Sequence, residues 1–302
     1  MRVVFGPTSC DNAGMSTSPS AGARLRAAAE LGPVALPGAF NALVGRAIAD
    51  AGFDGCYVSG AAMSVSAGVP DVGLLTLTEF AVEIGRIADA SGLPVVADAD
   101  TGFGEYEQSL RTVVEYERAG AAGLHVEDQV FPKRCGHLDG KELVPCEEMC
   151  LKVEAMVSAK RDPDFLVIAR TDARGVTGMD DAIARANAYR AAGADAIFPE
   201  GLQSEAEFEA FAKGSPGLLL ANMTEFGKTP FITLDRFGEL GYRLVIFPVS
   251  LLRLAMGEVV RSLGVLKTTG SFEGLADRMQ TRKELYETLG YEPGTPWKVR
   301  RS

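Results

Sequence analysis

Five consecutive residues, Lys133-Arg134-Cys135-Gly136-His137, bring together a thiol, two fixed cations and an imidazole. Positive charge near a cysteine favours the thiolate, so Cys135 is predicted to be the reactive sulfur of the chain. Just upstream, the apolar stretch 123–129 carries Glu127 and Asp128 near its end. Cations, a thiol and carboxylates in one region predict chemistry on a small anionic substrate.

A second group of carboxylates indicates a metal site. Asp98 and Asp100 alternate along one apolar run, so their side chains share a face of the predicted strand. Carboxylates aimed at one point repel each other unless a cation joins them, and Mg²⁺ prefers oxygen ligands and keeps several waters. We expect Mg²⁺, with Mn²⁺ as an alternative, bound directly by Asp98 and through water by Asp100 and Glu127. Alternatively, Asp100 and Asp128 cap helices or pair with Arg170.

Two further positions can bind carboxylate groups. Arg170 ends an apolar run, and its planar fork suits bidentate binding of a carboxylate. Its alternative is a structural ion pair with Glu200 or Asp172. The triplet Ser59-Gly60-Ala61 offers backbone N–H groups and a hydroxyl for a second carboxylate.

His125 lies mid-run among apolar neighbours. A core histidine bonded to a neighbour is its preferred interpretation. Its place on the same strand face as Glu127 keeps a role in the site open.

These side chains need a scaffold, and the sequence repeats one unit eight times. Near-continuous runs of Val, Ile, Leu and Ala, typical of strands buried on both faces, are each followed by an amphipathic helical pattern. The predicted strands are 34–40, 55–60, 94–100, 123–128, 165–172, 196–200, 218–223 and 243–249. The predicted helices are 42–51, 78–90, 106–119, 147–159, 179–192, 204–212, 234–240 and 251–263.

This alternation predicts an α/β fold of the (β/α)₈ barrel type. A doubly wound sheet would bring a Gly-rich phosphate loop after its first strand, which the sequence lacks. Polar residues end most of the predicted strands, and barrel active sites are built at those ends. We expect residues 1–14 to be a disordered extension, with Met15 as an alternative start, and 15–302 to form one barrel domain. A further helix over 271–290 would cap the site or pack on a neighbouring subunit.

The amino-acid composition limits which binding partners and which cellular compartment we expect for this chain. A net charge of −10 disfavours nucleic acid and anionic membranes, which both select basic surfaces. No apolar run approaches the roughly 20 residues that span a bilayer. Five cysteines without a secretion signal fit a reducing cytoplasm, so Cys10, Cys56, Cys146 and Cys150 are taken as bystanders. Zinc bound by Cys135 and His137 is disfavoured because the remaining soft ligands are missing.

Several motifs resemble the isocitrate lyase / phosphoenolpyruvate mutase superfamily over roughly 30–290. The resemblance rests on segments 98–104, 124–129, 133–137, 169–172, 198–200, 221–230 and 279–286. The last two are most similar to the short 2-methylisocitrate lyases of the methylcitrate cycle. The resemblance implies a barrel whose C-terminal helix is swapped between subunits of a homotetramer, a dimer of dimers. It also implies Mg²⁺ and retro-aldol cleavage of a tricarboxylate to pyruvate and succinate.

The resemblance also assigns the site. It implies catalytic roles for Lys133, Cys135, His137 and Arg170, with Cys135 as proton donor to carbon. The other substrate-binding positions that it implies are Ser59, Gly60, Ala61, Asp71, Glu200, Asn222, Thr224 and Arg282, with Phe198, Ile246 and Pro248 around a methyl group. One departure is Ala61, where the family usually has glycine. A position that needs a positive φ would strain alanine.

Three alternatives stay open. The same site could cleave 2,3-dimethylmalate or isocitrate. A carboxyphosphonoenolpyruvate phosphonomutase shares the 133–137 motif, although it needs no counterpart of Arg282. A catalytically silent barrel that binds dicarboxylates is the third, disfavoured by the retained metal, thiol and arginine positions.

Overall fold

The computed structural model describes residues 18–134, 136 and 140–297. In this part of the chain, eight parallel strands form two sheets, in the orders β1-β8-β7 and β2-β3-β4-β5-β6. Single parallel bridges, Gly38 to Tyr57 and Ile197 to Leu219, join the two sheets and continue the ring. The strands are β1 Val34–Pro37, β2 Cys56–Val58, β3 Val95–Asp98, β4 Gly123–Glu127, β5 Leu166–Thr171, β6 Ala196–Pro199, β7 Leu220–Asn222 and β8 Leu244–Phe247. The predicted α/β barrel class is confirmed.

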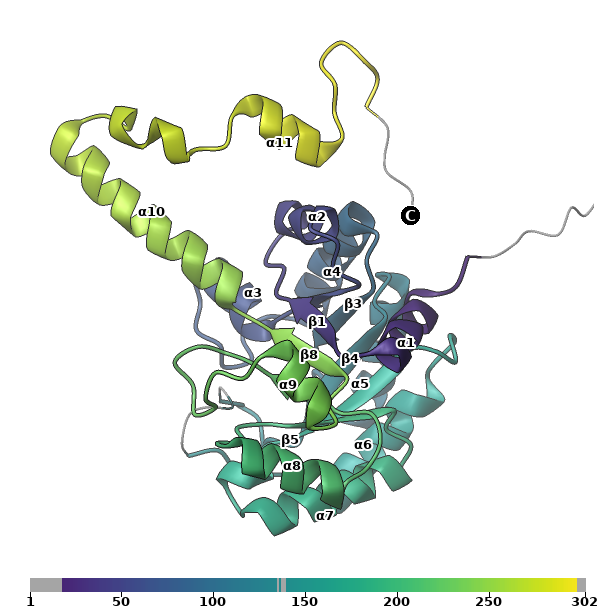
Figure 1. Ribbon diagram of the computed structural model, residues 1–302. Coiled ribbons are helices and arrows are strands. Elements are labelled where there is room, and N and C mark those ends of the chain that lie inside the picture. The colour runs from purple at the N-terminus through teal and green to yellow at the C-terminus, as the bar shows by residue number, and fades with distance from the viewer. Residues whose placement is uncertain (1–17, 135, 137–139, 298–302) are drawn as a thin grey trace, which may run out of the picture.

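Each strand is followed by a helix, and the helices after β1 to β7 cover the ring (Figure 1). Polar caps start several of them: Asn41 accepts from Val44 N–H, and Thr76 forms a capping box with Glu79. The covering helices are α2 Ala42–Asp50, α4 Leu77–Ser91, α5 Tyr106–Arg118, α6 Cys146–Ser158, α7 Met179–Ala191, α8 Glu205–Gly214 and α9 Leu234–Glu239, and α10 Ser250–Thr269 follows the last strand. All eight lie close to their predicted ranges, and α10 continues beyond its own.

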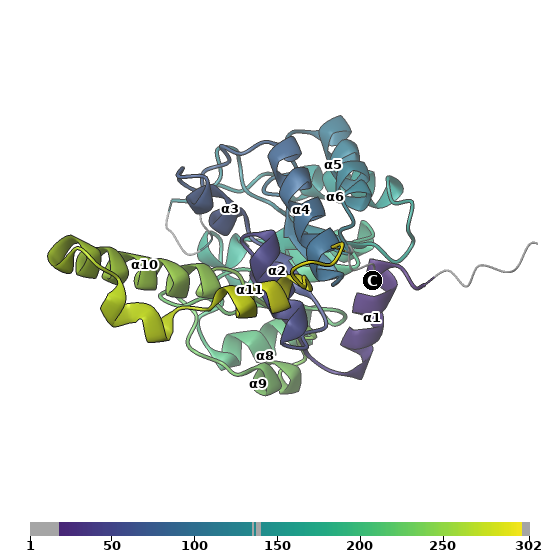
Figure 2. The ribbon, with the colours of Figure 1, turned by 90° about the horizontal axis from the view of Figure 1, so that it is seen from above.

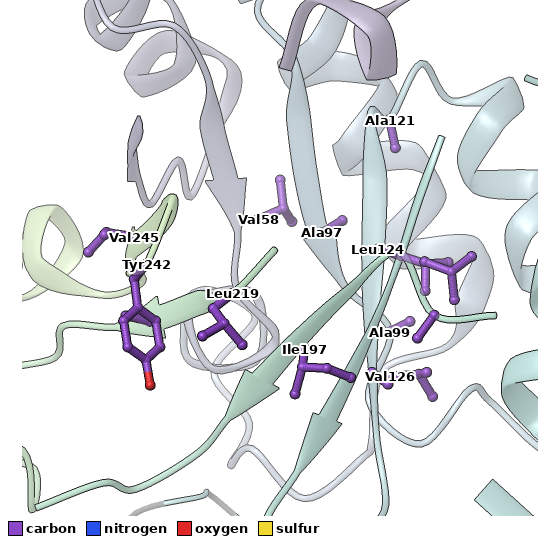
Figure 3. Close-up of a cluster of buried hydrophobic side chains, with 14 of the residues drawn as sticks. Val58, Ala97, Ala99, Ala121, Leu124, Val126, Ile197, Leu219, Tyr242 and Val245 are labelled. Atoms are coloured by element: carbon purple, nitrogen blue, oxygen red, sulfur yellow. The ribbon is translucent and has the colours of Figure 1, made fainter. Parts of the chain in front are cut away.

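Alternate side chains of the strands enter two apolar layers. One set, which includes Val58, Leu124 and Ile197, packs under the helices (Figure 3). The other set, which includes Val96 and Ile246, fills the inside of the ring. Both faces are therefore buried, which explains why the strands read as continuous apolar runs.

Helix α1, Ala21–Leu31, was not predicted from the sequence. Its Leu25 and Ala29 join the inner apolar layer beside the first residues of the strands. Arg26 fixes it there by donating to Asp164 O at 2.9 Å and to Asp195 Oδ1 at 2.6 Å. The helix closes the N-terminal end of the ring, so the opposite end holds the polar side chains.

The C-terminal elements leave the body of the ring. Helix α10 projects outward in both Figure 1 and Figure 2, and the chain returns through η2, Glu273–Arg278, and α11, Arg282–Leu289. The single helix predicted over 271–290 is thus two short ones, because Met279 between them is extended. Helix α11 packs near α2, where Arg46 Nη1 donates to Thr288 O at 3.3 Å. Within the described ranges, no helix is long and apolar enough to cross a bilayer.

Candidate active site

A cavity of about 240 Å³ lies at the carboxyl ends of the strands. Most of the residues predicted for the site meet there: Ser59, Ala61, Asp71, Asp98, Lys133, Arg170, Phe198, Glu200, Asn222, Thr224, Ile246 and Pro248. Gly60 and Asp100 do not line the cavity, but their backbone N–H groups donate to Asp98. Glu127 forms an ion pair with Arg170. Cys135 and His137 lie outside the described residues.

Asp98 is held by backbone groups on two sides. Its Oδ2 accepts from Gly60 N–H at 3.0 Å, and its Oδ1 accepts from Asp100 N–H at 2.9 Å. Asp100 itself has φ +45°, a left-handed conformation that non-glycine residues seldom adopt. A local backbone arrangement that costs free energy therefore orients both carboxylates.

One backbone group of the triplet 59–61 is already engaged, while Ser59 and Ala61 line the cavity. Ser59 caps helix α3, Gly60–Ser66, and Gly60 N–H is committed to Asp98. Ala61 lies in the first turn of α3 and is not among the described residues with positive φ. The strain considered for alanine at this position does not arise.

Lys133 joins two acidic side chains at the cavity wall. Its Nζ lies 2.8 Å from Asp100 Oδ1 and also forms an ion pair with Asp71. Burial would lower the pKa of Lys133, but Glu127, Asp98 and the paired acids raise it above its usual value. Lys133 is therefore a permanent cation that draws the Asp71 loop toward the end of β3.

Arg170 is surrounded by acids. Its Nε and Nη2 donate to Asp172 at 3.0 and 3.2 Å, and its Nη1 lies 3.1 Å from Glu127 Oε2. Its guanidinium also stacks over Phe198 at 5.2 Å and lies 3.9 Å from Glu200. The structural pairing considered from the sequence is present, and it fixes a cation that still lines the cavity.

The acidic side chains fit a hydrated divalent cation. Burial raises the pKa of Glu127, and Glu127 Oε1 has no hydrogen-bond partner among the described residues. Burial and the nearby Asp98 raise the pKa of Asp100 to about 6. A cation would favour the ionised form of both. In the described part of the chain, no three acidic, His or Cys side chains converge as direct metal ligands, so any ion held here would keep waters.

His125 is a core residue, as preferred from its neighbours. Burial lowers its pKa to about 4, so its ring is neutral. Its Nε2 lies 2.6 Å from the hydroxyl of Tyr57, which lines the cavity from β2. Burial raises the pKa of Tyr57 well above its usual value, so the phenol keeps its proton.

Arg253 is a cavity residue that the sequence analysis missed. It lies in the first turn of α10, and its Nη1 donates to Thr224 Oγ1 at 3.2 Å and to Glu225 O at 2.6 Å. Its position directly after the eighth strand was the available signal, because that places it at the open end of the ring. Arg282 lies exposed on α11 and does not line the cavity of its own chain.

The chain is similar to known proteins in both sequence and fold. The family described as phosphoenolpyruvate phosphomutase matches residues 24–266. The chain belongs to this family. Its match spans all eight strands and the cavity, and it ends within α10, before Arg282.

Individual relatives are similar over most of their length. A Corynebacterium glutamicum protein named "Probable 2-methylisocitrate lyase 1" is 56% identical over 258 residues, 85% of either chain. The 2-methylisocitrate lyase of Bacillus subtilis is 49% identical over 257 residues, 85% of this chain and 84% of its own. A solved structure of 2,3-dimethylmalate lyase has a TM-score of 0.85 at 37% identity, covering 90% of this chain and 92% of that one.

Proposed function

We propose that the protein cleaves 2-methylisocitrate to pyruvate and succinate, a step of the methylcitrate cycle in propionate catabolism. The observation that carries this proposal is one cavity lined by the cations Lys133, Arg170 and Arg253 and by the carboxylate of Asp98. Fixed cations bind the carboxylates of the substrate, and the acidic side is suited to a metal. The names of the similar lyases support the same activity.

We propose Mg²⁺ as the cofactor, with Mn²⁺ as an alternative, held by Asp98 directly and by Asp100 and Glu127 through water. When bound, such an ion polarises a hydroxyl and its neighbouring carboxylate. Removal of divalent ions with a chelator should abolish turnover, and added Mg²⁺ should restore it.

The protein's own groups bind and orient the substrate. Arg170, held in plane by Asp172, would bind one substrate carboxylate in a bidentate manner. Arg253 and Asn222 would contact the succinyl part. Phe198, Ile246 and Pro248 form an apolar wall where the extra methyl group would lie.

The proposed reaction moves one proton at each end of the breaking bond. Tyr57 binds the substrate's hydroxyl group and donates its own hydrogen bond to the neutral His125 Nε2, 2.6 Å away, while the hydroxyl proton is released to water in the cavity. The C2–C3 electron pair then becomes the carboxylate-stabilised carbanion of succinate, which Arg170 and its neighbouring cations stabilise. Cys135 donates a proton to that carbon, and His137 and Lys133 assist. A bound trianion would raise the pKa of the thiol and so keep it protonated for this step.

The proposed assembly is a homotetramer in the cytoplasm. Its C-terminal segment would be swapped between subunits, so that Arg282 of one chain completes the site of another. The projecting α10 and the absence of Arg282 from the described cavity of its own chain support this proposal.

The direct test is to mix the protein, Mg²⁺ and 2-methylisocitrate and to follow pyruvate with a coupled dehydrogenase. We expect turnover, and kcat/KM above that for 2,3-dimethylmalate and isocitrate. Discrimination by one methyl group is limited to about 1–3 kcal/mol, so weak side activity is expected. No pyruvate from 2-methylisocitrate would reject the proposal.

A second candidate is 2,3-dimethylmalate cleavage, which the 0.85 TM-score to that lyase favours. The same comparison decides it, because a higher kcat/KM for 2,3-dimethylmalate would make that compound the substrate.

The role of Cys135 has its own test. Cys135→Ser should lower kcat by roughly 100-fold or more, because a serine hydroxyl is a far weaker acid than a thiol and general acid catalysis contributes on this scale. Cys150→Ser, on α6, is the matched control and should leave kcat unchanged. Near-normal turnover of Cys135→Ser would remove the thiol from the mechanism.

A further inference from the structure

Lys141 is a buried lysine close to the site that the proposed mechanism does not use. It is 8% exposed and lies in the stretch 140–144. This stretch runs antiparallel to the residues that follow β4: Val130 N–H donates to Glu142 O at 2.8 Å, and Val144 N–H donates to Asp128 O at 2.9 Å. Residues 140–144 thus have backbone hydrogen bonds that do not depend on the Lys141 side chain.

The ammonium of Lys141 donates to two acceptors that belong to different parts of the site. It lies 2.8 Å from Asp172 Oδ1 and 2.5 Å from Gly136 O. Asp172 is the carboxylate that holds Arg170 in a bidentate pair. A single cation therefore joins Asp172, the partner of Arg170, to the backbone at Gly136.

Gly136 is packed against the same two side chains that face the substrate. A Cβ at this position would lie 2.3 Å from Arg170 Nη2 and 2.4 Å from Glu200 Cγ. The Gly136 peptide therefore lies against Arg170 and Glu200 in a space that no side chain at this position could share. Lys141 supplies a hydrogen bond that pulls it there.

Among the described residues, the neighbouring hydrogen bonds and ion pairs hold positions before Gly136. Gln129 exchanges two hydrogen bonds of 2.9 Å with the backbone of Arg134, and Lys133 is paired with Asp100 and Asp71. These contacts fix Lys133 and Arg134, which precede Gly136 in the chain. Burying an ammonium group costs free energy unless strong acceptors bind it. Asp172 Oδ1 and Gly136 O are these acceptors for Lys141.

We propose that Lys141 is a positioning residue, which holds Gly136 and Asp172 against Arg170 and so keeps the Arg170 guanidinium in place for the reaction. This inference rests on the proposed function for its kinetic consequence. Its structural consequence, slower opening of the backbone at Gly136, does not depend on which substrate is used.

The test compares three variants. Lys141→Met removes the ammonium and keeps the side-chain length, and Lys141→Arg restores a cation with several donors. Lys160→Met is the matched control, because Lys160 is also a largely buried lysine paired with an aspartate, Asp195 at 3.0 Å, at the closed end of the ring. Measurements are kcat and KM for 2-methylisocitrate, thermal midpoint, and hydrogen–deuterium exchange of the peptide that contains Gly136.

In Lys141→Met we expect kcat to fall by roughly 10- to 100-fold, because small misplacements of reacting groups cost this much. KM should change less, the thermal midpoint should stay within the range of Lys160→Met, and exchange at the Gly136 peptide should accelerate. Lys141→Arg should recover most of kcat, and Lys160→Met should keep it.

Three results would overturn the proposal: unchanged kcat in Lys141→Met, an equal loss in Lys160→Met, or no recovery in Lys141→Arg. If the wild type turns over none of the substrates, the proposed function fails separately. Exchange then decides the role of Lys141, since an unchanged rate at the Gly136 peptide would refute the anchoring.

Discussion

Gly60 has no side chain, and that permits Asp98 to approach the first turn of α3. A Cβ at this position would lie 2.8 Å from Asp98 Oδ2 and 3.1 Å from Asp100 Oδ1. The first contact is shorter than carbon and oxygen tolerate and the second is tight, so the Asp98 carboxylate would have to move. The positions of the Asp98 and Asp100 carboxylates therefore depend on glycine at residue 60.

We expect Gly60→Ala to lower kcat/KM by roughly 10- to 100-fold through displacement of Asp98, and to raise the Mg²⁺ concentration needed for half activity. Steady-state kinetics against a Mg²⁺ titration checks both. Gly85→Ala on α4 is the control, because its Cβ would meet nothing closer than 3.8 Å. That change should keep activity and add up to about 1 kcal/mol to the free energy of unfolding. Equal activities of the two variants would contradict the role given to Gly60.

At the scale of elements, Asp128 ties three segments together behind the site. Its carboxylate accepts from Thr171 Oγ1 at the end of β5, from Asp172 N–H after it, and from Tyr189 on α7, each at 2.8 Å. Burial and the neighbouring Asp172 raise its pKa. The position of Arg170 thus depends on a buried acid that never reaches the cavity.

Asp128→Asn should destabilise the fold by about 1–3 kcal/mol, because the amide group cannot accept all three hydrogen bonds and leaves a buried donor unpaired. Urea unfolding followed by circular dichroism measures this change. Asp180→Asn, exposed in the first turn of α7, is the matched control and should change stability by much less. Equal midpoints for both variants would show that the network contributes no net stability.

At the scale of the molecule, α10 exposes large apolar side chains along its length. Leu254, Val260 and Leu263 are 70%, 64% and 56% exposed in the single chain. An apolar surface of this kind on a projecting helix is typical of a subunit interface. It is the described surface on which the proposed tetramer depends most.

The double variant Val260→Glu, Leu263→Lys should therefore reduce the molar mass measured by light scattering during size-exclusion chromatography. Leu31→Lys is the control, since Leu31 is 92% exposed on α1, away from α10, and should leave the mass unchanged. A wild-type mass of one chain would contradict the assembly, and an unchanged mass in the double variant would remove α10 from it.

The sequence predicted the strands well because both of their faces are buried and their apolar runs are continuous. It also placed Asp98, Arg170 and Glu200 at the correct end of the ring, since each ends a strand. Helix α1 escaped notice because only a narrow face, with Leu25 and Ala29, enters the core. The contacts of Lys141 and Arg253 depend on segments that are distant in the sequence, and no periodic pattern predicts such contacts.

The pairing of β1 with β8 also determines how the chain can fold. Val34 pairs with Leu244, whereas the backbone pairing toward β2 in the described part of the chain is one bridge, from Gly38 just after β1 to Tyr57. During synthesis, β1 emerges first and must wait for its main partner until nearly the whole ring has been made. Such distant pairing slows folding and leaves a strand edge open to other chains. Helix α1, which packs on the strand beginnings, is the local element that can shield β1 during that delay.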